Sequence, residues 1–471
     1  MEKHSIRTIA ISVSLSCLLF VLMMFFISKS DWFRPNVYVK EVQNARMVGL
    51  YDLPSIYDQQ DFIKVAEEIK SATVYIKVWQ NTEGGSDLFS QNLQLQHGSG
   101  FIISEDGYIA TNLHVVKNAA EIHVTLDDRR EFQGRLVGED AHTDIAVIKI
   151  ECNNLPSVRF GDSNLLRPGQ WVLAAGNPLR LQSSISAGII SALSRNINTM
   201  DSRGIESYIQ TDLTANSGSS GGPLVNLQGE LCGMVTAVIT ETGTDGFTFA
   251  IPSNVVKKIC RDLIAYGAAQ RAWLGVETEN MDAKKARELD VSEVKGVLIS
   301  NLESESAAAK AGIQVGDILL KIDGFRINNS SQLSEKLALY YPGDEVELEI
   351  LRKGRAQTLM ATLTNHLKGT DKITIYRSGI WRQLGIEIRE LNKDELKITP
   401  GGGIYVVSVS RNSSAWESNI SPGLIITTAN GKKIENISSI LSILETHPDS
   451  LHLEGRYVNF PGVFPYVIKM R

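Results

Sequence analysis

The chain is poor in the residue types on which several protein classes depend. Its 471 residues include only four cysteines, Cys17, Cys152, Cys232 and Cys260, with no C-x-x-C pair and no His/Cys spacing typical of a metal site. They do not make a disulfide framework, and no metal or organic cofactor is expected. Basic residues are outnumbered, 47 Lys and Arg against 53 Asp and Glu, which gives a net charge of −6. Nucleic-acid-binding domains usually carry a basic excess, so no nucleic-acid partner is expected.

Charge is also missing from one long stretch near the N-terminus. Between Thr8 and Ser28 there is no charged residue, and about 20 apolar residues in a helix span a bilayer. Lys3 and Arg7 precede this run, which favours a cytoplasmic N-terminus. A cleaved signal peptide is the alternative, but the run is long for one and no Ala-x-Ala site follows it. We therefore predict a single-pass anchor in the inner membrane over residues 1–30, with the body of the chain in the periplasm or outside the cell.

What the chain does contain is a loop rich in serine and glycine. Residues 217–224 read Ser-Gly-Ser-Ser-Gly-Gly-Pro-Leu. Such a run is by itself equally typical of a flexible linker. Interpreted as a catalytic loop, it presents Ser220 as a nucleophile, and the backbone N–H groups of Gly218 and Ser220 form an oxyanion hole.

Two upstream residues favour the catalytic interpretation. His114 follows the strand-like run Tyr108–Thr111, and Asp144 stands at the head of the apolar run 145–149. Taken singly, His114 also fits a core histidine, and Asp144 also fits a strand-capping acid. The chain order His, Asp, Ser is that of chymotrypsin-like proteases and differs from the orders of subtilisins and α/β-hydrolases. Together the three residues predict a catalytic triad.

The pattern of short apolar and alternating runs indicates a mainly β protein. Two sets of about six strands each predict two antiparallel β-barrels, with the active site in the crevice between them. The predicted strands are 74–78, 100–103, 108–111, 121–126 and 144–150, then 171–175, 186–191, 229–238 and 248–251. Helices are predicted over 61–70 and from Val255 to about Tyr266.

The last third of the chain contains an internal repeat at a constant offset of 107 residues. Asp323-Gly324 and Asn430-Gly431 occupy matching positions, and both predict a hairpin with a type I′ turn. Asn419 replaces Gly312, which suits a position with positive φ because Asn tolerates that conformation best after Gly.

These motifs together resemble the HtrA (Deg) family of serine proteases. The segments that carry the resemblance are 97–104, 107–116, 143–147, 210–212 and 246–254. It implies a serine endopeptidase that acts through an acyl-enzyme and assembles as a homotrimer or a higher multiple. Ser217 and Ser219 depart from the Pro and Asn usual in the family, which affects the rigidity of the loop. Thr214 stands where trypsin-like pockets have an acid, so a basic P1 residue is not expected. The resemblance implies small aliphatic P1 residues instead.

The repeated segment resembles a pair of PDZ domains, which bind peptide C-termini by strand addition. In the first copy, Leu274, Gly275 and Val276 are the residues expected to bind the peptide carboxylate, with a helix near 333–339 as the opposite wall. For the second copy, peptide binding and a purely docking role both stay open, because Asp317 and Gly312 are replaced there.

The predicted fold class is a chymotrypsin-like double β-barrel followed by two PDZ-like α+β domains. The predicted boundaries are 1–30 for the anchor, 31–60 for a tether, 61–268 for the protease, 269–367 for the first PDZ domain and 374–471 for the second. The predicted function is hydrolysis of misfolded or signal-bearing envelope proteins, regulated by peptides bound at the PDZ domains. The alternative is a PDZ scaffold or chaperone whose protease fold has lost activity.

Overall fold

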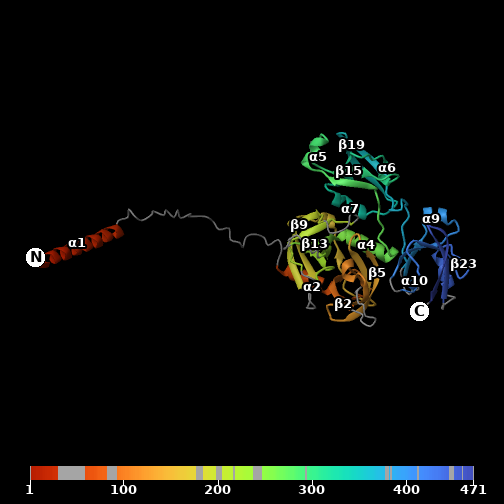
Figure 1. Cartoon of the computed structure of the whole chain (residues 1–471), viewed down its shortest axis with the longest axis horizontal. Coiled ribbons are helices and arrows are strands. Elements are labelled where there is room, and N and C mark those ends of the chain that lie inside the picture. The colour runs from red at the N-terminus through yellow and green to blue at the C-terminus, as the bar shows by residue number, and fades with distance from the viewer. Residues whose placement is uncertain are drawn as a thin grey trace. The chain divides into compact units, whose positions relative to one another are not determined.

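The computed structural model describes residues 2–29, 59–81, 93–176, 184–197, 204–215, 218–236, 247–291, 294–376, 381, 384–410, 413–444, 450–458 and 460–469. The chain divides into two compact units, Met1–Asp58 and Gln59–Arg471. In the first unit, α1 (Glu2–Lys29) is one continuous helix (Figure 1). The membrane-spanning helix predicted over 1–30 is not confirmed: in the described part of the chain, no helix is both long and apolar enough to cross a membrane. Nearly all of the predicted tether, 31–60, lies outside the described residues.

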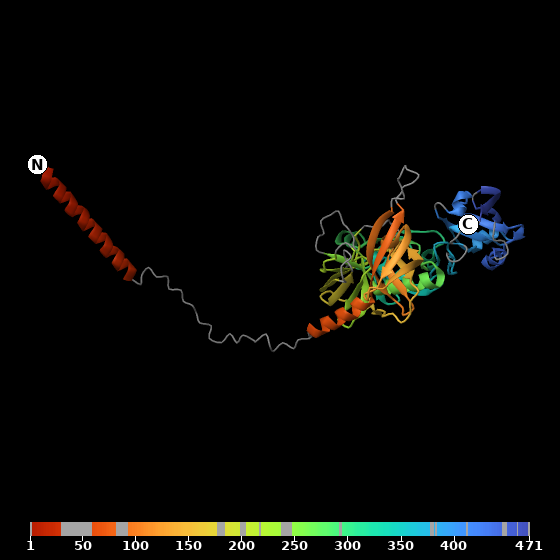
Figure 2. The same cartoon turned by 90° about the horizontal axis from the view of Figure 1, so that it is seen from below.

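The second unit begins with α2 (Gln59–Ala72), which runs directly into the first strand of a barrel (Figure 2). Six strands close this barrel in the order β1-β2-β3-β6-β5-β4. They are β1 (Thr73–Asn81), β2 (Leu93–Ile102), β3 (Tyr108–Asn112), β4 (Ala119–Thr125), β5 (Glu131–Asp140) and β6 (Ile145–Lys149). Alternation along β1 buries Val74, Ile76 and Val78 inside the barrel, because successive side chains of a strand point to opposite faces. A single helical turn, α3 (Leu113–Val116), follows β3.

A second barrel follows, with the strand order β11-β8-β9-β10-β13-β12-β7. Pairing between β11 and β12 closes six of these strands into a ring, and β7 pairs with β12 in parallel. The strands are β7 (Arg159–Phe160), β8 (Trp171–Gly176), β9 (Ser184–Arg195), β10 (Tyr208–Thr211), β11 (Pro223–Asn226), β12 (Glu230–Thr236) and β13 (Thr248–Pro252). The two predicted barrels are thus confirmed.

Helix α4 (Ser253–Tyr266) packs against strands of both barrels, β6 and β12 (Figure 1). Its apolar face, which includes Val256, Ile259 and Leu263, is completely buried in the largest core of the chain. The helix ends at Gly267, whose φ of 68° is a left-handed conformation that Gly adopts without strain. This helix ties the two barrels together and confirms the helix predicted from Val255 to about Tyr266.

Two smaller sheets follow, and their strand orders match. One is β14-β15-β16-β18-β19, with β17 paired to β16, and the other is β20-β21-β22-β24-β25, with β23 paired to β22. The first sheet has β14 (Val276–Asn280), β15 (Val297–Leu302), β16 (Ile318–Ile322), β17 (Phe325–Arg326), β18 (Glu345–Arg352), β19 (Arg355–Thr362), and helices α5 (Ala283–Glu288), α6 (Ala307–Ala311) and α7 (Ser330–Ala338). The second has β20 (Ile386–Glu390), β21 (Ile404–Val409), β22 (Leu424–Ala429), β23 (Lys432–Lys433), β24 (Ser450–Tyr457), β25 (Phe460–Lys469), and helices α9 (Lys393–Ile398), α10 (Ser414–Glu417) and α11 (Ile437–Leu444).

The backbone confirms the two turn predictions made from the repeat. Asp323 and Gly324 have φ of 47° and 72°, and Asn430 and Gly431 have 46° and 74°, as a type I′ turn requires at both central positions. Asn419 has φ of 60° where Gly312 has 86°. The substitution of Asn for Gly therefore keeps a left-handed residue at the same point of each copy.

Candidate active site

The predicted histidine and aspartate are in direct contact. Asp144 Oδ2 lies 2.6 Å from His114 Nδ1, and Asp144 Oδ1 accepts the backbone N–H of His114 at 2.9 Å. His114 stands on α3, whose other three residues are buried, so its side chain, 40% exposed, is the one turned away from the core. A carboxylate in this position selects the tautomer with the proton on Nδ1 and leaves Nε2 as an acceptor.

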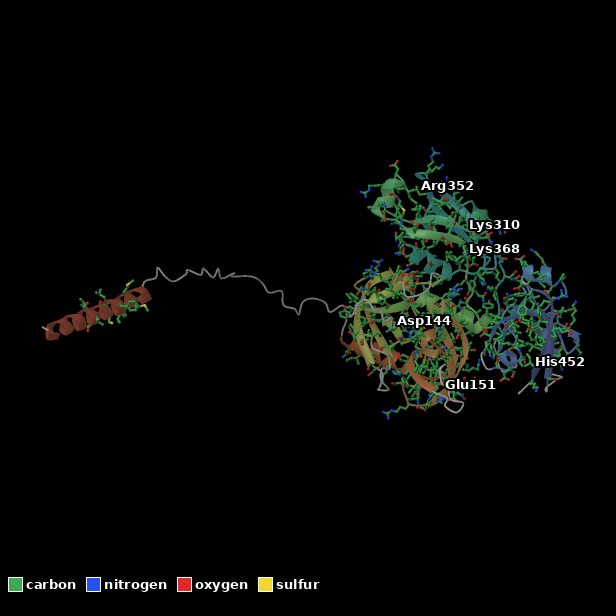
Figure 3. The ribbon with its side chains drawn as sticks, viewed as in Figure 1. Asp144, Glu151, Lys310, Arg352, Lys368 and His452 are labelled. Carbon is green, nitrogen blue, oxygen red and sulfur yellow. The ribbon has the colours of Figure 1, made fainter. Side chains whose placement is uncertain are left out.

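Asp144 is itself held by both barrels. Its backbone carbonyl accepts Leu113 N–H and Asn112 Nδ2, each at 3.0 Å, which ties it to the start of α3. Thr236 Oγ1, from β12 of the second barrel, donates to Asp144 Oδ2 at 3.4 Å. Asp144 lies among the strands of the barrels (Figure 3), and its φ of 56° makes it a left-handed residue just ahead of β6. These contacts leave the carboxylate little freedom to turn away from His114.

The loop of Ser220 is anchored on both barrels as well. Ser99 N–H on β2 donates to Ser220 O at 2.8 Å, and Gly221 N–H donates to Val235 O on β12 at 2.8 Å. Val235 N–H in turn donates to Gly222 O, after which the chain enters β11. Ser220 is 6% exposed and lies in this turn between the two barrels.

Gly98 on β2 marks the point where the elements carrying His114 and Ser220 converge. A Cβ built on Gly98 would lie 2.7 Å from the Cγ atoms of Val115 and 3.3 Å from Ser220 O. Real Cβ atoms do not approach other atoms at the shorter of these distances, so only Gly lets the helical turn and the serine loop come this close to β2. The helical turn that carries His114, which is bonded to Asp144, thus meets the loop that carries Ser220 beside Gly98 in β2.

The predicted oxyanion-hole residue Gly218 lies on the same loop. It is buried, and its φ of 97° is accessible in practice only to Gly. Its carbonyl accepts a hydrogen bond of 2.6 Å from Ser99 Oγ. Asn216 and Ser217, which precede it, lie outside the described residues.

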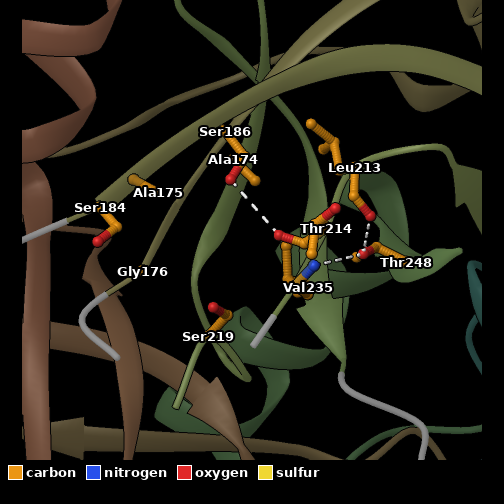
Figure 4. A pocket seen from close by; sticks show the side chains of 11 residues that line it. Ala174, Ala175, Gly176, Ser184, Ser186, Leu213, Thr214, Ser219, Val235 and Thr248 are labelled. Atoms are coloured by element: carbon orange, nitrogen blue, oxygen red, sulfur yellow. Dashed lines mark hydrogen bonds between the residues drawn. The ribbon is translucent and has the colours of Figure 1, made fainter. Parts of the chain in front are cut away.

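A small pocket lies next to the serine loop (Figure 4). Its cavity holds about 30 Å³ and is lined by small, uncharged residues: Ala174, Ala175, Gly176, Ser184, Ser186, Leu213, Thr214, Ala215, Ser219, Val235 and Thr248. Thr248 Oγ1 donates to Leu213 O at 2.5 Å and accepts Ala215 N–H at 3.0 Å, which fixes one wall. Thr214 is among these residues, and none of the described residues that line the pocket is acidic. The pocket therefore suits a short apolar side chain.

The predicted carboxylate-binding residues lie at the start of β14. Leu274 is buried, Gly275 has φ of 80°, and Val276 opens the strand. The carbonyl groups of the first two are occupied, since Leu274 O accepts Ala308 N–H at 2.9 Å and Gly275 O accepts Glu303 N–H at 3.0 Å. Because the C=O and N–H of a trans peptide point in opposite directions, the N–H groups of Gly275 and Val276 point away from Ala308 and Glu303. The matching Gly385 repeats the arrangement, because it has φ of 71° and its carbonyl accepts Ser410 N–H at 2.7 Å.

Some residues of the site were not predicted from the sequence. Ser99, Asn112 and Thr236 all bond directly to the triad or its loops. Their bonds join segments distant in the chain, and no local pattern signals them.

The comparisons with known proteins agree with this geometry. Residues 98–234 match the trypsin-like peptidase domain, and residues 272–363 match the PDZ domain. A "Probable periplasmic serine endoprotease DegP-like" from Marinomonas sp. is 36% identical over 374 residues, which cover 79% of each chain. The chain belongs to the HtrA/DegP family of serine endoproteases. A relative of the same name from Chlamydia muridarum is 35% identical over 354 residues, 74% of this chain and 69% of the relative.

Solved structures of HtrA proteases are also similar. The "HtrA-type protease AlgW with tripeptide" has a TM-score of 0.53 at 32% identity and covers 64% of this chain and 96% of its own. The same protease with a decapeptide has a TM-score of 0.50 at 31% identity, covering 65% of this chain and 98% of its own. As a member of the HtrA/DegP family, the chain is a serine endopeptidase with a trypsin-like domain and a PDZ domain. The relatives favour this function over the alternative of an inactive scaffold, and they are named as periplasmic.

Proposed function

We propose that Ser220 is the nucleophile of this endopeptidase, His114 its general base and Asp144 the residue that orients the imidazole. The observation that carries the proposal is the 2.6 Å contact between His114 Nδ1 and Asp144 Oδ2, beside a serine loop held on β2 and β12. With the Nδ1 proton committed to Asp144, Nε2 takes the proton of Ser220 Oγ as the oxygen attacks the peptide carbonyl. The same proton then passes to the leaving amine, and water repeats the sequence to release the acyl group.

The negative charge that develops on the carbonyl oxygen requires donors in place before the attack. We assign this role to the backbone N–H groups of Gly218 and Ser220, which lie on one turn. Removing one such donor from a serine protease costs roughly 3–4 kcal/mol of transition-state stabilisation. Backbone groups supply this stabilisation whatever side chains occupy positions 217 and 219.

The substrate class follows from the pocket and from the first PDZ domain. A cavity of about 30 Å³ whose described lining holds no acidic residue favours small aliphatic residues such as Ala or Val at P1. Leu274, Gly275 and Val276 are proposed to bind the terminal carboxylate of a peptide that adds to β14, which lies at the edge of its sheet. Misfolded or C-terminal-signal-bearing envelope proteins are the proposed substrates, and a peptide bound at the PDZ domain is the proposed regulator.

The remaining assignments concern the ends of the chain and its assembly. The strand order of β20–β25 supports a second PDZ domain over 374–471, beside the proposed protease (61–268) and first PDZ domain (269–367). We further propose that the uncharged run Thr8–Ser28 attaches the chain to the inner membrane. We also propose that the chain assembles as a homotrimer or a higher multiple. Cell fractionation of the full chain and of a chain lacking residues 1–30 tests the attachment.

Cleavage of an unfolded protein such as casein tests the catalytic assignment. The full-length chain is expected to produce fragments ending mainly in small aliphatic residues, whereas Ser220→Ala is expected to produce none. The assay is repeated with peptides of varied C-termini, so that a missing activator is not mistaken for a missing active site. Equal cleavage by both chains would contradict the assignment of Ser220.

A further inference from the structure

Ser99 holds the nucleophile loop at two points. Its backbone N–H donates to Ser220 O at 2.8 Å, and its hydroxyl Oγ donates to Gly218 O at 2.6 Å. The side chain is fully buried, and Ser99 O is itself bound by Thr111 Oγ1 at 2.7 Å. One residue of the first barrel is thus bonded to both residues that are proposed to form the oxyanion hole.

The strand that carries Ser99 is a rigid support for these bonds. β2 pairs with β1 on one side, where Ser99 is opposite Tyr75, and with β3 on the other side at Phe101 and Ile102, close to Ser99. Both neighbours belong to a closed barrel, in which every strand is paired on two sides. The hydroxyl is therefore fixed relative to the His114–Asp144 pair, which the same barrel carries.

The two bonds do not have the same chemical basis. The bond from the Ser99 backbone N–H needs only a peptide bond at position 99 and survives any substitution other than proline. The bond from Oγ needs a hydroxyl, and its acceptor is the carbonyl of a glycine at φ of 97°. Glycine has the largest conformational freedom of any residue, so a loop that depends on it requires an external restraint to keep one orientation.

We propose that Ser99 is a positioning residue of the protease, whose hydroxyl holds Gly218 in the orientation in which its N–H and that of Ser220 face the same carbonyl oxygen. This rests on the proposed roles of Ser220 and Gly218. Without the hydroxyl, Gly218 O is left buried without this donor and the residue is free to rotate, so that one oxyanion donor is misdirected. Ser99 acts on the transition state through Gly218 and touches no reacting atom.

Substitution of Ser99 by Ala tests the proposal by its effect on kcat and KM. After correction for the number of active sites by titration, kcat is expected to fall about 10- to 100-fold while KM changes less than about threefold, because oxyanion donors act in the transition state. The Ki of a peptide boronate, which forms a tetrahedral adduct with the nucleophile, is expected to rise by the same factor as kcat falls. The Ki of the matching product peptide is expected to stay constant. Ser99→Cys, which offers only a weak S–H donor at nearly the same volume, is expected to fall between wild type and Ser99→Ala.

Thr73→Val is the matched control. Thr73 is also a buried hydroxyl of the first barrel and donates to a backbone carbonyl at 2.7 Å, but its acceptor, Ile69 O, belongs to α2 and not to the serine loop. It is expected to lower Tm about as much as Ser99→Ala and to keep both kcat and the boronate Ki. The proposal would be overturned if Ser99→Ala lowered Tm but left kcat per titrated site unchanged. It would also be overturned if kcat fell while the boronate Ki stayed the same. The turnover of the wild-type chain is compared with that of Ser220→Ala in the same assay. A loss of turnover in this variant supports the proposed function independently of the result for Ser99.

Discussion

His114 and Asp144 are joined twice, through Nδ1 to Oδ2 at 2.6 Å and through the backbone N–H to Oδ1 at 2.9 Å. The carboxylate therefore fixes both the imidazole and the helical turn that carries it. An amide in its place would present an N–H or a weaker acceptor to Nδ1 and so favour the wrong tautomer.

We expect Asp144→Asn to lower kcat by about 10⁴-fold with little change in Tm, because the fold is kept and the tautomer is lost. Peptide hydrolysis measured per folded molecule checks this prediction. Asp128→Asn is the control, since Asp128 is an exposed carboxylate of the same barrel that pairs with Arg130, and it should leave kcat unchanged. A reduction of less than tenfold for Asp144→Asn would argue against its assigned role.

Gly98→Ala is expected to reduce both stability and activity. The new Cβ would meet the Val115 side chain at 2.7 Å, and overpacking of this kind costs about 1–3 kcal/mol. Either β2 or the turn carrying His114 must shift, so the fraction of titratable active sites should fall together with Tm. Gly369→Ala, where the nearest atoms to an added Cβ lie at 3.5 Å or more, should change neither.

Val235→Ala is expected to change which substrates are cleaved. Val235 lines the small pocket, and truncating it enlarges a cavity of about 30 Å³. One methylene group in such a pocket changes selectivity by roughly 10- to 200-fold. The ratio of kcat/KM for Leu over Ala at P1 should therefore rise at least about tenfold in a peptide series. A rise in cleavage after Arg instead would contradict the pocket assignment, because none of the described lining residues is an acid that could pair with Arg.

The buried thiols are expected to be unreactive in the folded chain. Burial raises the pKa of both Cys232 and Cys260 from about 9 to about 12, so neither forms the thiolate that reacts with Ellman's reagent near pH 8. In a Cys17→Ser chain, one thiol, the partly exposed Cys152, should react promptly and two only after denaturation. The unfolded chain loses these protons first, so the free energy of unfolding should fall as pH rises from about 9 towards 12. Three equally fast thiols in the native chain would be inconsistent with this burial.

The triad could be predicted from the sequence because each member stands at a local landmark. His114 follows an apolar strand, Asp144 precedes one, and Ser220 lies among the glycines that its turn requires. The helical turn of His114 was not predicted, since four residues are too few to show a period. Strand β5 was not predicted either, because its exposed residues are polar or charged and Gly134 interrupts the apolar pattern.

The contacts that complete the site depend on tertiary structure. Ser99 and Gly218 are 119 residues apart, and Thr236 reaches Asp144 across 92 residues and between barrels. A serine in a strand and a threonine in a strand carry no sign of such partners. The turns of the repeated modules were predictable because they depend on local sequence alone. Asp-Gly and Asn-Gly pairs favour the positive φ that Asp323, Gly324, Asn430 and Gly431 adopt.

Closure of the first barrel also protects the enzyme from its own substrates. Each strand in the ring β1-β2-β3-β6-β5-β4 is paired with a neighbouring strand on both sides. The ring therefore has no edge strand to which another chain could add. HtrA proteases meet misfolded polypeptides, which are prone to add themselves to any exposed strand. The scaffold that holds His114 and Asp144 therefore exposes no unpaired strand of this ring, whereas β14, the proposed docking strand for extended chains, lies at the edge of its sheet.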